Sequence, residues 1–494
     1  MGQIGPVRAS EEALRTAPAW QKLRDLVDRF PFGLAPFIIL SLTLIAAGWL
    51  AGHPIPKTEA TLRLWTFANI HAMAYEKVAP AFEAKHPGTT VSIQLVHGTA
   101  VTSRLRAAFW SDLDVPDLVE VEISSAGSFF RGPIDDIGFV DLTPRLKSTD
   151  PKDAGLSAPL LKDGSIDPTS PGPRVPLYDR IVKTRFAPYS NRDRIFGLPH
   201  DVHPVMLAYR RDIFEELGIK AEELDTWDKF IAVGRKITKP GERYMIEFSD
   251  SGSGNFEPIL FQRDGGYFDA DGKVTMDNEI AVQTVLWYIP LVAGPGRIGN
   301  DLGWGDIFTR AVEAGYFLTF ICPDWRSKGV EESIPRMAGK MALMPVPAFT
   351  PGGRRTTTWG GTMLGLTRKC RNPDLTWKLA QHLYLDTESL AERFRELNIL
   401  PPLRDAWRHP AFAEPRPYWS NQPIGTLYTA LADQVPPQFT SPFIELAKSK
   451  MSEVISACAQ YYREHGDVGF DAFARECLRR AADQVRLQMA RNPF

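Results

Sequence analysis

The chain has little of what marks several large functional classes. It holds only four cysteines in 494 residues, with no CxxC pair and no histidine at metal-ligand spacing, so a zinc site is not expected. The four cysteines, Cys322, Cys370, Cys458 and Cys477, are predicted to be buried free thiols. The alternative is one disulfide between Cys458 and Cys477. There is also no nucleophile elbow and no phosphate-binding glycine loop, and we expect no cofactor.

Positive charge is scarce as well. The formal net charge is -2 and no long basic run occurs, so nothing offsets the charge of a phosphate backbone and nucleic acid is not expected as a partner. With 44% hydrophobic and 23% charged residues, the composition is that of a globular protein, and 494 residues are too many for a single core. We therefore expect two or three domains.

The longest uncharged run covers residues 32–50, FGLAPFIILSLTLIAAGWL, which is about the length needed to cross a bilayer. Basic residues precede it at Arg8, Arg15, Lys22, Arg24 and Arg29, whereas Lys57 and Arg63 alone follow soon after. This asymmetry predicts a cytoplasmic tail over 1–31, a single-pass transmembrane anchor over 32–52, a tether over 53–60 and a body on the extracytoplasmic, periplasmic side of the inner membrane. A cleaved signal peptide with its small residues at 46–52 is the alternative.

The body begins with alternating strand and helix patterns. Strands are predicted over 60–67, 91–96 and 117–123, with helices over 72–85 and 102–109 between them. This order indicates an α/β fold with a parallel doubly wound sheet, in which ligands bind beyond the carboxyl ends of the strands. The rule selects Trp65, Phe67 and Asn69 after the first strand and Glu120, Glu122, Ser124 and Ser125 after the third. The glutamates fit an exposed edge strand equally well, and Trp65 fits the core.

The most informative stretch is 195–211, IFGLPHDVHPVMLAYRR. His200, Asp201 and His203 interrupt an otherwise apolar pair of strands there. Buried polar groups without partners cost several kcal/mol, about 2–7, so such residues usually lie where a ligand or another domain comes close. We interpret these three residues as the entrance to a cleft.

Two later stretches test other possibilities. Residues 148–176 are rich in Pro, Ser, Asp and Gly and are predicted to be a surface excursion. The run DADGK suggests a calcium loop from Asp269, but Lys273 and Ile280 occupy positions where such a loop needs oxygen ligands. A turn at Asp271 and Gly272 between two short strands is the better prediction.

Several motifs in order resemble one known family. They are LRLWTF, YEKVAPAFEAKHPGTTVSI, VPDLVEVE, IFGLPHDVHPVMLAYRRDIFEELGI, TWDKFIAVGRKIT, DGGYFDADGKVTMD, CPDWRS and WGGTMLGLTRKCRNPDLTWKLAQHLY. From about residue 61 to about residue 460 the chain is similar to the extracellular solute-binding proteins of ABC importers, in their sugar-binding, maltose-binding-protein-like branch.

The resemblance implies a type II periplasmic-binding-protein fold of two α/β lobes. The first lobe would hold 61–200 plus 355–405 and the second 201–354 plus 406–494, with the chain crossing near 200–204, 345–359 and 401–409. The ligand would lie between the lobes. The positions that match the family's ligand contacts are Phe67, Asn69, Glu122, Ser124, Ser125, Asp201, His203, Asp324, Trp325, Trp359, Gly360, and Tyr418 or Trp419.

Departures from the family's pattern argue against maltose itself. Ser124 and Ser125 stand where maltose-binding protein has charged residues, and His203 stands where it has a glutamate. Sugar sites combine hydrogen-bonding side chains with aromatic surfaces. The candidates supply both: Glu122, Asp201 and His203 as hydrogen-bonding groups, and Trp325, Trp359 and Trp419 as stacking surfaces, although each tryptophan also fits a core role.

The sequence therefore predicts a membrane-tethered solute-binding subunit that captures a carbohydrate, an oligosaccharide or glycoside, for separate ABC permease subunits. A glycoside-processing enzyme is the first alternative. It is disfavoured because Glu120 and Glu122, two apart on a strand, point to the same face and cannot flank a glycosidic bond. A sensory module that signals through a separate membrane receptor is the second alternative.

Overall fold

The computed structural model describes residues 34–52, 61–111, 113–156 and 175–492, together with Pro18 and Gln21. Apart from those two positions, the predicted tail and tether lie outside the described residues, as does most of the predicted excursion over 148–176. The chain divides into two compact units, residues 1–59 and 60–494.

The first unit contains helix α3 (Leu34–Gly52), of 19 residues. Its described large apolar side chains are exposed, among them Ile39, Leu42, Leu44, Ile45 and Trp49. Within the described part of the chain, no helix reaches the length and apolar character needed to cross a membrane.

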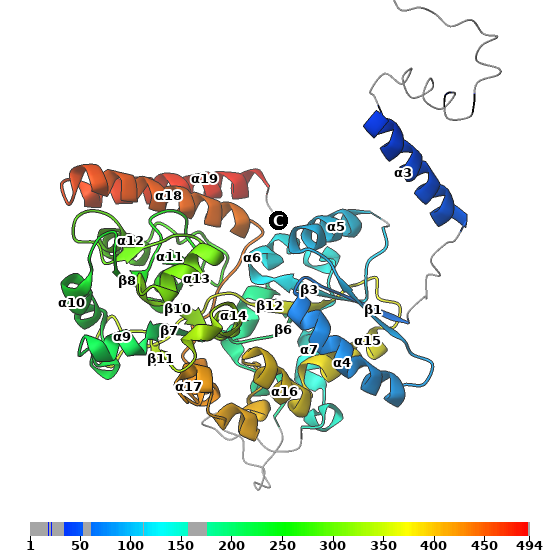
Figure 1. The fold of residues 1–494 in the computed structure, drawn as a ribbon. Coiled ribbons are helices and arrows are strands. Elements are labelled where there is room, and N and C mark those ends of the chain that lie inside the picture. The colour runs from blue at the N-terminus through cyan, green and yellow to red at the C-terminus, as the bar shows by residue number, and fades with distance from the viewer. Residues whose placement is uncertain are drawn as a thin grey trace, which may run out of the picture. The chain divides into compact units, whose positions relative to one another are not determined.

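The second unit begins with a five-stranded sheet in the order β2-β1-β3-β12-β6 (Figure 1). Its strands are β1 (Leu62–Thr66), β2 (Val91–Leu95), β3 (Leu118–Glu122), β6 (Leu198–Pro199) and β12 (Thr362–Leu366). The first three are parallel as predicted, but β12 runs antiparallel to β3 and β6. The complete sheet is therefore mixed, because β12 comes from a distant part of the chain and follows β11 without a helical crossover. Pro199 pairs within β6, an edge strand, where its missing N–H is tolerated.

Helices cover both faces of this sheet, because alternate residues of its strands are apolar on both sides. In β3, Leu118 packs into one buried cluster with Tyr75 of α4 (Asn69–Lys85), whereas Val119 and Val121 pack into another with Leu105 of α5 (Gly98–Trp110). Helix α15 (Pro373–Tyr384) lies beside α4 (Figure 1). The central strand β3 is thus buried on both faces, and a ligand can meet it only at its end.

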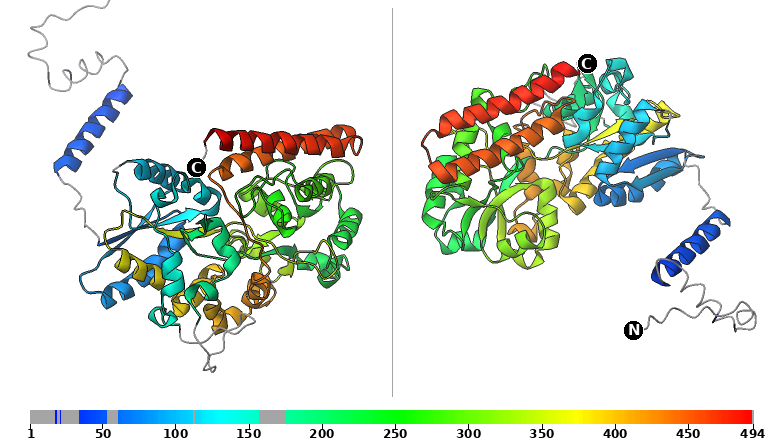
Figure 2. Two further views of the ribbon diagram at one scale, coloured as in Figure 1. Left: turned by 180° about the vertical axis from the view of Figure 1, so that it is seen from behind. Right: turned by 90° about the horizontal axis from the view of Figure 1, so that it is seen from above.

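A second five-stranded sheet has the order β11-β7-β10-β8-β9. Its strands are β7 (Val205–Arg210), β8 (Tyr244–Glu247), β9 (Gly299–Asn300), β10 (Phe317–Pro323) and β11 (Met341–Pro345). Helices α10 (Trp227–Ile237), α11 (Phe256–Gln262) and α12 (Glu279–Val292) pack around it, and α18 (Ile444–His465) and α19 (Phe470–Arg491) lie over α12 (Figures 1 and 2). The second unit therefore consists of two α/β lobes.

The remaining elements connect or flank these sheets. They are β4 (Ser190–Asn191), β5 (Arg194–Ile195), α6 (Ile123–Ala126), α7 (Thr143–Ser148), α8 (Leu177–Arg180), α9 (Arg211–Glu216), α13 (Asp306–Glu313), α14 (Asp324–Ser333), α16 (Thr387–Leu397) and α17 (Ile424–Ala432).

Local sequence signals explain several boundaries. Helix α12 begins because the Asn278 side chain accepts the N–H of Ala281 at 2.9 Å. Helix α10 starts after Thr226, but the Thr226 hydroxyl forms no cap; this residue is instead buried and forms a β-bridge with Ala348. The turn at Asp271 and Gly272 is confirmed, with Gly272 at φ +76°.

Three chain segments lie against one another between the two sheets. Pro204 pairs with Thr358, the Val205 N–H donates to the Thr357 carbonyl at 3.0 Å, and the Val202 N–H donates to the Leu400 carbonyl at 3.0 Å. The segments 200–204, 356–361 and 399–403 therefore form one connected region, which we call the crossing. The exact lobe boundaries stay a prediction.

Candidate functional site

A cavity of about 90 Å³ has walls from both lobes. Glu122 and Ile123 enter it from the carboxyl end of β3 in the first lobe, and Trp359 and Gly360 come from the crossing. Pro188 adds to the wall of the first lobe, and the second lobe, the segment before α18 and α18 itself supply the rest: Glu257, Phe261, Tyr267, Gln438, Phe439, Thr440, Ile444 and Lys448. The cavity thus lies beyond the strand ends, where the fold favours a ligand.

Two carboxylates and one ammonium group line this cavity. Lys448 Nζ lies 3.0 Å from Glu257 Oε2, while the Tyr267 hydroxyl donates to Glu257 Oε1 at 2.8 Å. On the other wall, Glu122 Oε2 accepts the Ser124 N–H at 3.0 Å. Burial raises the pKa of Glu122 to about 6, although the charge of Lys448 opposes the shift. Glu257 is satisfied by the protein, whereas Glu122 and Lys448 keep capacity for further hydrogen bonds.

Three tryptophans form an aromatic cluster beside the crossing. The rings of Trp304 and Trp325 are stacked, with their centroids 6.1 Å apart, and the ring centroid of Trp359 lies 5.7 Å from each of them. The Trp325 indole N–H donates to the Trp359 carbonyl at 3.0 Å, which fixes its orientation. The Arg326 guanidinium lies 4.5 Å from the centre of the Trp304 ring, yet Trp304 is 61% exposed, so much of its indole is open to a ligand.

The polar residues of the crossing bond to one another. His203 Nδ1 lies 2.5 Å from Asp324 Oδ1, and His203 Nε2 lies 3.1 Å from Asp201 Oδ2. Asp201 also accepts from Arg185 and from the Thr362 N–H, and Asp324 accepts from the Leu400 N–H at 2.6 Å. Burial alone would lower the pKa of His203, but the two carboxylates raise it to about 9. We therefore interpret this group as an ionic clamp on the crossing, with its polar atoms engaged inside the protein.

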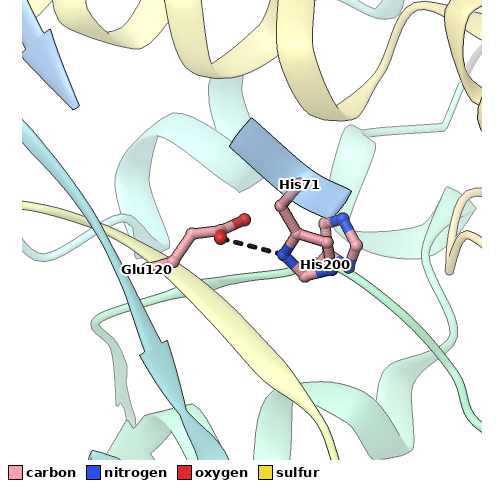
Figure 3. Close-up of side chains that lie close together, drawn as sticks. All are labelled: His71, Glu120 and His200. Carbon is pink, nitrogen blue, oxygen red and sulfur yellow. Dashed lines mark hydrogen bonds and ion pairs between the residues drawn. The ribbon is translucent and has the colours of Figure 1, made fainter. Parts of the chain in front are cut away.

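A buried cluster of His71, Glu120 and His200 lies next to the crossing, with ligand atoms near enough to hold a metal ion (Figure 3). Each candidate ligand is already hydrogen-bonded within the protein, however. His71 Nδ1 lies 2.9 Å from Glu120, which also accepts from the hydroxyls of Thr66, Tyr75 and Tyr384. Arg393 lies 3.1 Å from His200 Nε2, and a guanidinium can only donate. The cluster is best described as a hydrogen-bonded network that connects α4 and β3 to the crossing.

Of the other predicted site residues, some lie at or near the cavity and one does not. Gly360 lines the cavity, and Ser124 and Ser125 are half-buried in α6 directly after Glu122. Phe67 is half-buried beside His71, and Asn69 is exposed at the start of α4. Trp419 does not reach the cavity, since its side chain is fully buried and its indole N–H donates to Glu331 at 2.8 Å.

Most of the residues that line the cavity are not identified from the sequence, and neither is Trp304 of the aromatic cluster. Glu257 is a carboxylate inside an apolar helix, α11, which is a recognisable signal for a buried polar role. Lys448 sits on an amphipathic helix, and Trp304 follows a short strand; neither pattern distinguishes these residues from ordinary surface positions.

The amino-acid sequence is similar to a known protein family and to several characterised proteins. A family model described as bacterial extracellular solute-binding protein matches residues 69–388. The chain is 23% identical to the arabinooligosaccharide-binding protein of Bacillus subtilis over 403 residues, 80% of this chain and 86% of that protein. It is 23% identical to the lactose-binding protein of Rhizobium radiobacter, over 80% of this chain and 87% of that protein.

Solved structures share the fold. The sugar-binding protein MalE from Xanthomonas citri is 18% identical, with a TM-score of 0.67 over 86% of this chain and 98% of that one. A cyclo/maltodextrin-binding protein complexed with maltotetraose is 16% identical, with a TM-score of 0.62 over 88% of this chain and 98% of that one.

Proposed function

Since the chain belongs to the bacterial extracellular solute-binding proteins, we propose that it captures an oligosaccharide or glycoside between its two lobes and delivers it to the permease subunits of an ABC importer. The observation that carries this proposal is the cavity with walls from both lobes, which is lined by two carboxylates and a tryptophan. Relatives named for arabinooligosaccharide and lactose binding support a carbohydrate ligand.

The size of the cavity bears on how a ligand enters. At about 90 Å³ it is smaller than the several hundred Å³, roughly 300–1,000, that ligand pockets usually offer. We therefore expect the lobes to separate to admit the ligand and to close on it afterwards, with the crossing as the hinge.

Glu122 and Lys448 define how the ligand is oriented. They belong to opposite walls and are not paired with each other within ion-pair distance in the described chain. A sugar hydroxyl donates one hydrogen bond and accepts others, so it can donate to Glu122 and accept from Lys448 at once. The stacking surfaces are Trp304, Trp325 and Trp359. Further proposed contacts are Phe67, Asn69, Ser124, Ser125 and Gly360.

A carbohydrate panel tests this proposal. The second unit, residues 60–494, is expected to melt at a higher temperature with its sugar, because a ligand that binds only the folded state stabilises it by mass action. Lys448→Met and Glu122→Gln should each lower the affinity for that sugar roughly 10-fold or more, because each removes a charged group that would form a hydrogen bond with it. Lys450→Met is the matched control, because Lys450 pairs with Glu453 on the same helix. Stabilisation by amino acids or peptides but by no sugar would contradict the proposal.

We also propose that residues 32–52 anchor the protein in the inner membrane, with the second unit outside the cytoplasm. The support is the uncharged run and the basic tail before it in the sequence. Membranes from the native host, washed with carbonate and analysed by mass spectrometry, are expected to retain the protein with its N-terminal peptide. A mature protein that starts near His53 would instead establish a cleaved signal peptide.

A further inference from the structure

The last two helices bring two cysteines together. Helices α18 and α19 form an antiparallel hairpin, connected by residues 466–469, and they run side by side in both views of Figure 2. Cys458 lies eight positions before this connection and Cys477 lies eight positions after it. Two such positions are level with each other across an antiparallel pair, so the hairpin places the two side chains opposite one another.

Contacts within the hairpin agree with this register. A thiol–thiol hydrogen bond shifts the pKa of both Cys458 and Cys477, and both cysteines are free in the structure. Cys458 is fully buried in the core of the second lobe, whereas Cys477 is half-buried at its surface. The predicted free thiols are thus present, and Cys458 and Cys477 lie near each other across the hairpin.

We propose that Cys458 and Cys477 form a disulfide in the native protein, which fastens the α18–α19 hairpin. Disulfides form and persist outside the cytoplasm, where the proposed function places this unit, and this inference rests on that location. Helix α18 carries Lys448 and its first turns lie against α6 of the other lobe, so the bond would hold the helix that reaches into the cavity.

The chemistry is a thiol–disulfide exchange with an oxidised disulfide donor, such as a protein disulfide or oxidised glutathione. The Cys477 thiolate attacks one donor sulfur, the donor S–S bond breaks, and one donor thiolate leaves. The Cys458 thiol then loses its proton and attacks the Cys477 sulfur, which expels the second donor thiolate. Two protein thiols are oxidised by two electrons, and the donor disulfide is reduced to two thiols.

The environment favours Cys477 as the first nucleophile. The hydrogen bond from Cys458 lowers the pKa of Cys477 to about 7, so a substantial fraction is thiolate near neutral pH. Cys477 is also the more accessible of the two sulfurs. The same hydrogen bond raises the pKa of Cys458, which therefore acts second.

The test exposes the full-length protein to oxidised glutathione, alkylates it after denaturation and maps its peptides by mass spectrometry. We expect one peptide pair linked through Cys458 and Cys477, with Cys322 and Cys370 alkylated. Closing a loop of this length should raise the melting temperature by about 3 °C over the reduced protein.

Variants separate a specific bond from general oxidation. Cys370→Ser should leave the linked pair and its melting shift unchanged, whereas Cys477→Ser should remove both. Two free thiols after oxidation would overturn the proposal, and so would a glutathione adduct that persists on Cys477, because Cys458 should displace it. These outcomes do not depend on whether any sugar binds, so they are distinguishable from failure of the proposed function.

Discussion

The ionic clamp on the crossing makes stability depend on pH in a defined direction. His203 is buried between Asp201 and Asp324, and these carboxylates raise its pKa from an ordinary value of 6.5 to about 9. Below pH 6.5 the folded and unfolded chains both carry this proton, so the stabilisation is complete. As the pH rises toward 9 only the folded chain keeps the proton, and the stabilisation is progressively lost.

The expected size of the effect follows from the same values. Because each pKa unit corresponds to about 1.4 kcal/mol, about 3 kcal/mol of unfolding free energy should depend on this proton. The imidazole is only 5% exposed, so solvent screens the interaction little. The nearby charges that share this environment are Arg185, which bonds Asp201, and His200, which lies 3.2 Å from the same carboxylate.

Urea unfolding between pH 6.5 and 9.5 measures this dependence. The wild-type unfolding free energy should fall by about 3 kcal/mol more than that of His203→Gln, which has no proton to lose. His97→Gln is the matched control, because His97 is exposed and should leave the wild-type slope intact. Equal slopes for the wild type and His203→Gln would refute the assignment of a charged clamp.

Other side chains give further expectations. Trp304→Ala should lower the affinity for the sugar roughly 10-fold in calorimetry. The melting temperature without ligand should stay nearly unchanged, because this indole is 61% exposed. Equal affinity of the variant and the wild type would exclude Trp304 from the site. Trp419→Phe should lower the unfolding free energy by about 1–3 kcal/mol in urea, because Glu331 loses a buried donor, and it should not change sugar affinity. Burial lowers the pKa of His200 to about 4, so between pH 6.5 and 4 the unfolded chain takes up a proton that the folded chain does not. The unfolding free energy should therefore fall by about 3 kcal/mol over this range. His200→Gln should flatten that part of the pH profile.

Local patterns predicted the elements near the first sheet well. The strand and helix order over the first 60 or so residues of the second unit was correct, because each strand is a short apolar run and each helix carries an apolar stripe. Glu122 follows from the same reasoning, since it directly ends β3 and lines the cavity. The direction of β12 was not predictable in this way, because pairing across more than two hundred residues leaves no local trace.

The crossing shows a different limit. The sequence singles out His200, Asp201 and His203 as polar residues between buried strands, and they are indeed buried. Their partners decide their role, however, and Arg185, Asp324 and Arg393 come from distant elements. Likewise, Glu257 and Lys448 meet only through the tertiary fold. The sequence pattern indicates that these charged residues are buried and therefore need partners. The partners themselves are known only from the tertiary structure.

The placement of β12 has a consequence for how the protein is made. This strand sits between β3 and β6 in the first sheet, yet it is synthesised after the strands β7 to β11 of the other lobe. A nascent chain that stops short of Leu366 leaves β3 with an unpaired inner edge, and a fragment cut after β6 lacks the strand that joins its sheet. Neither lobe is a contiguous stretch: the first sheet is complete only after β12 has been synthesised, and the second lobe only after α18 and α19.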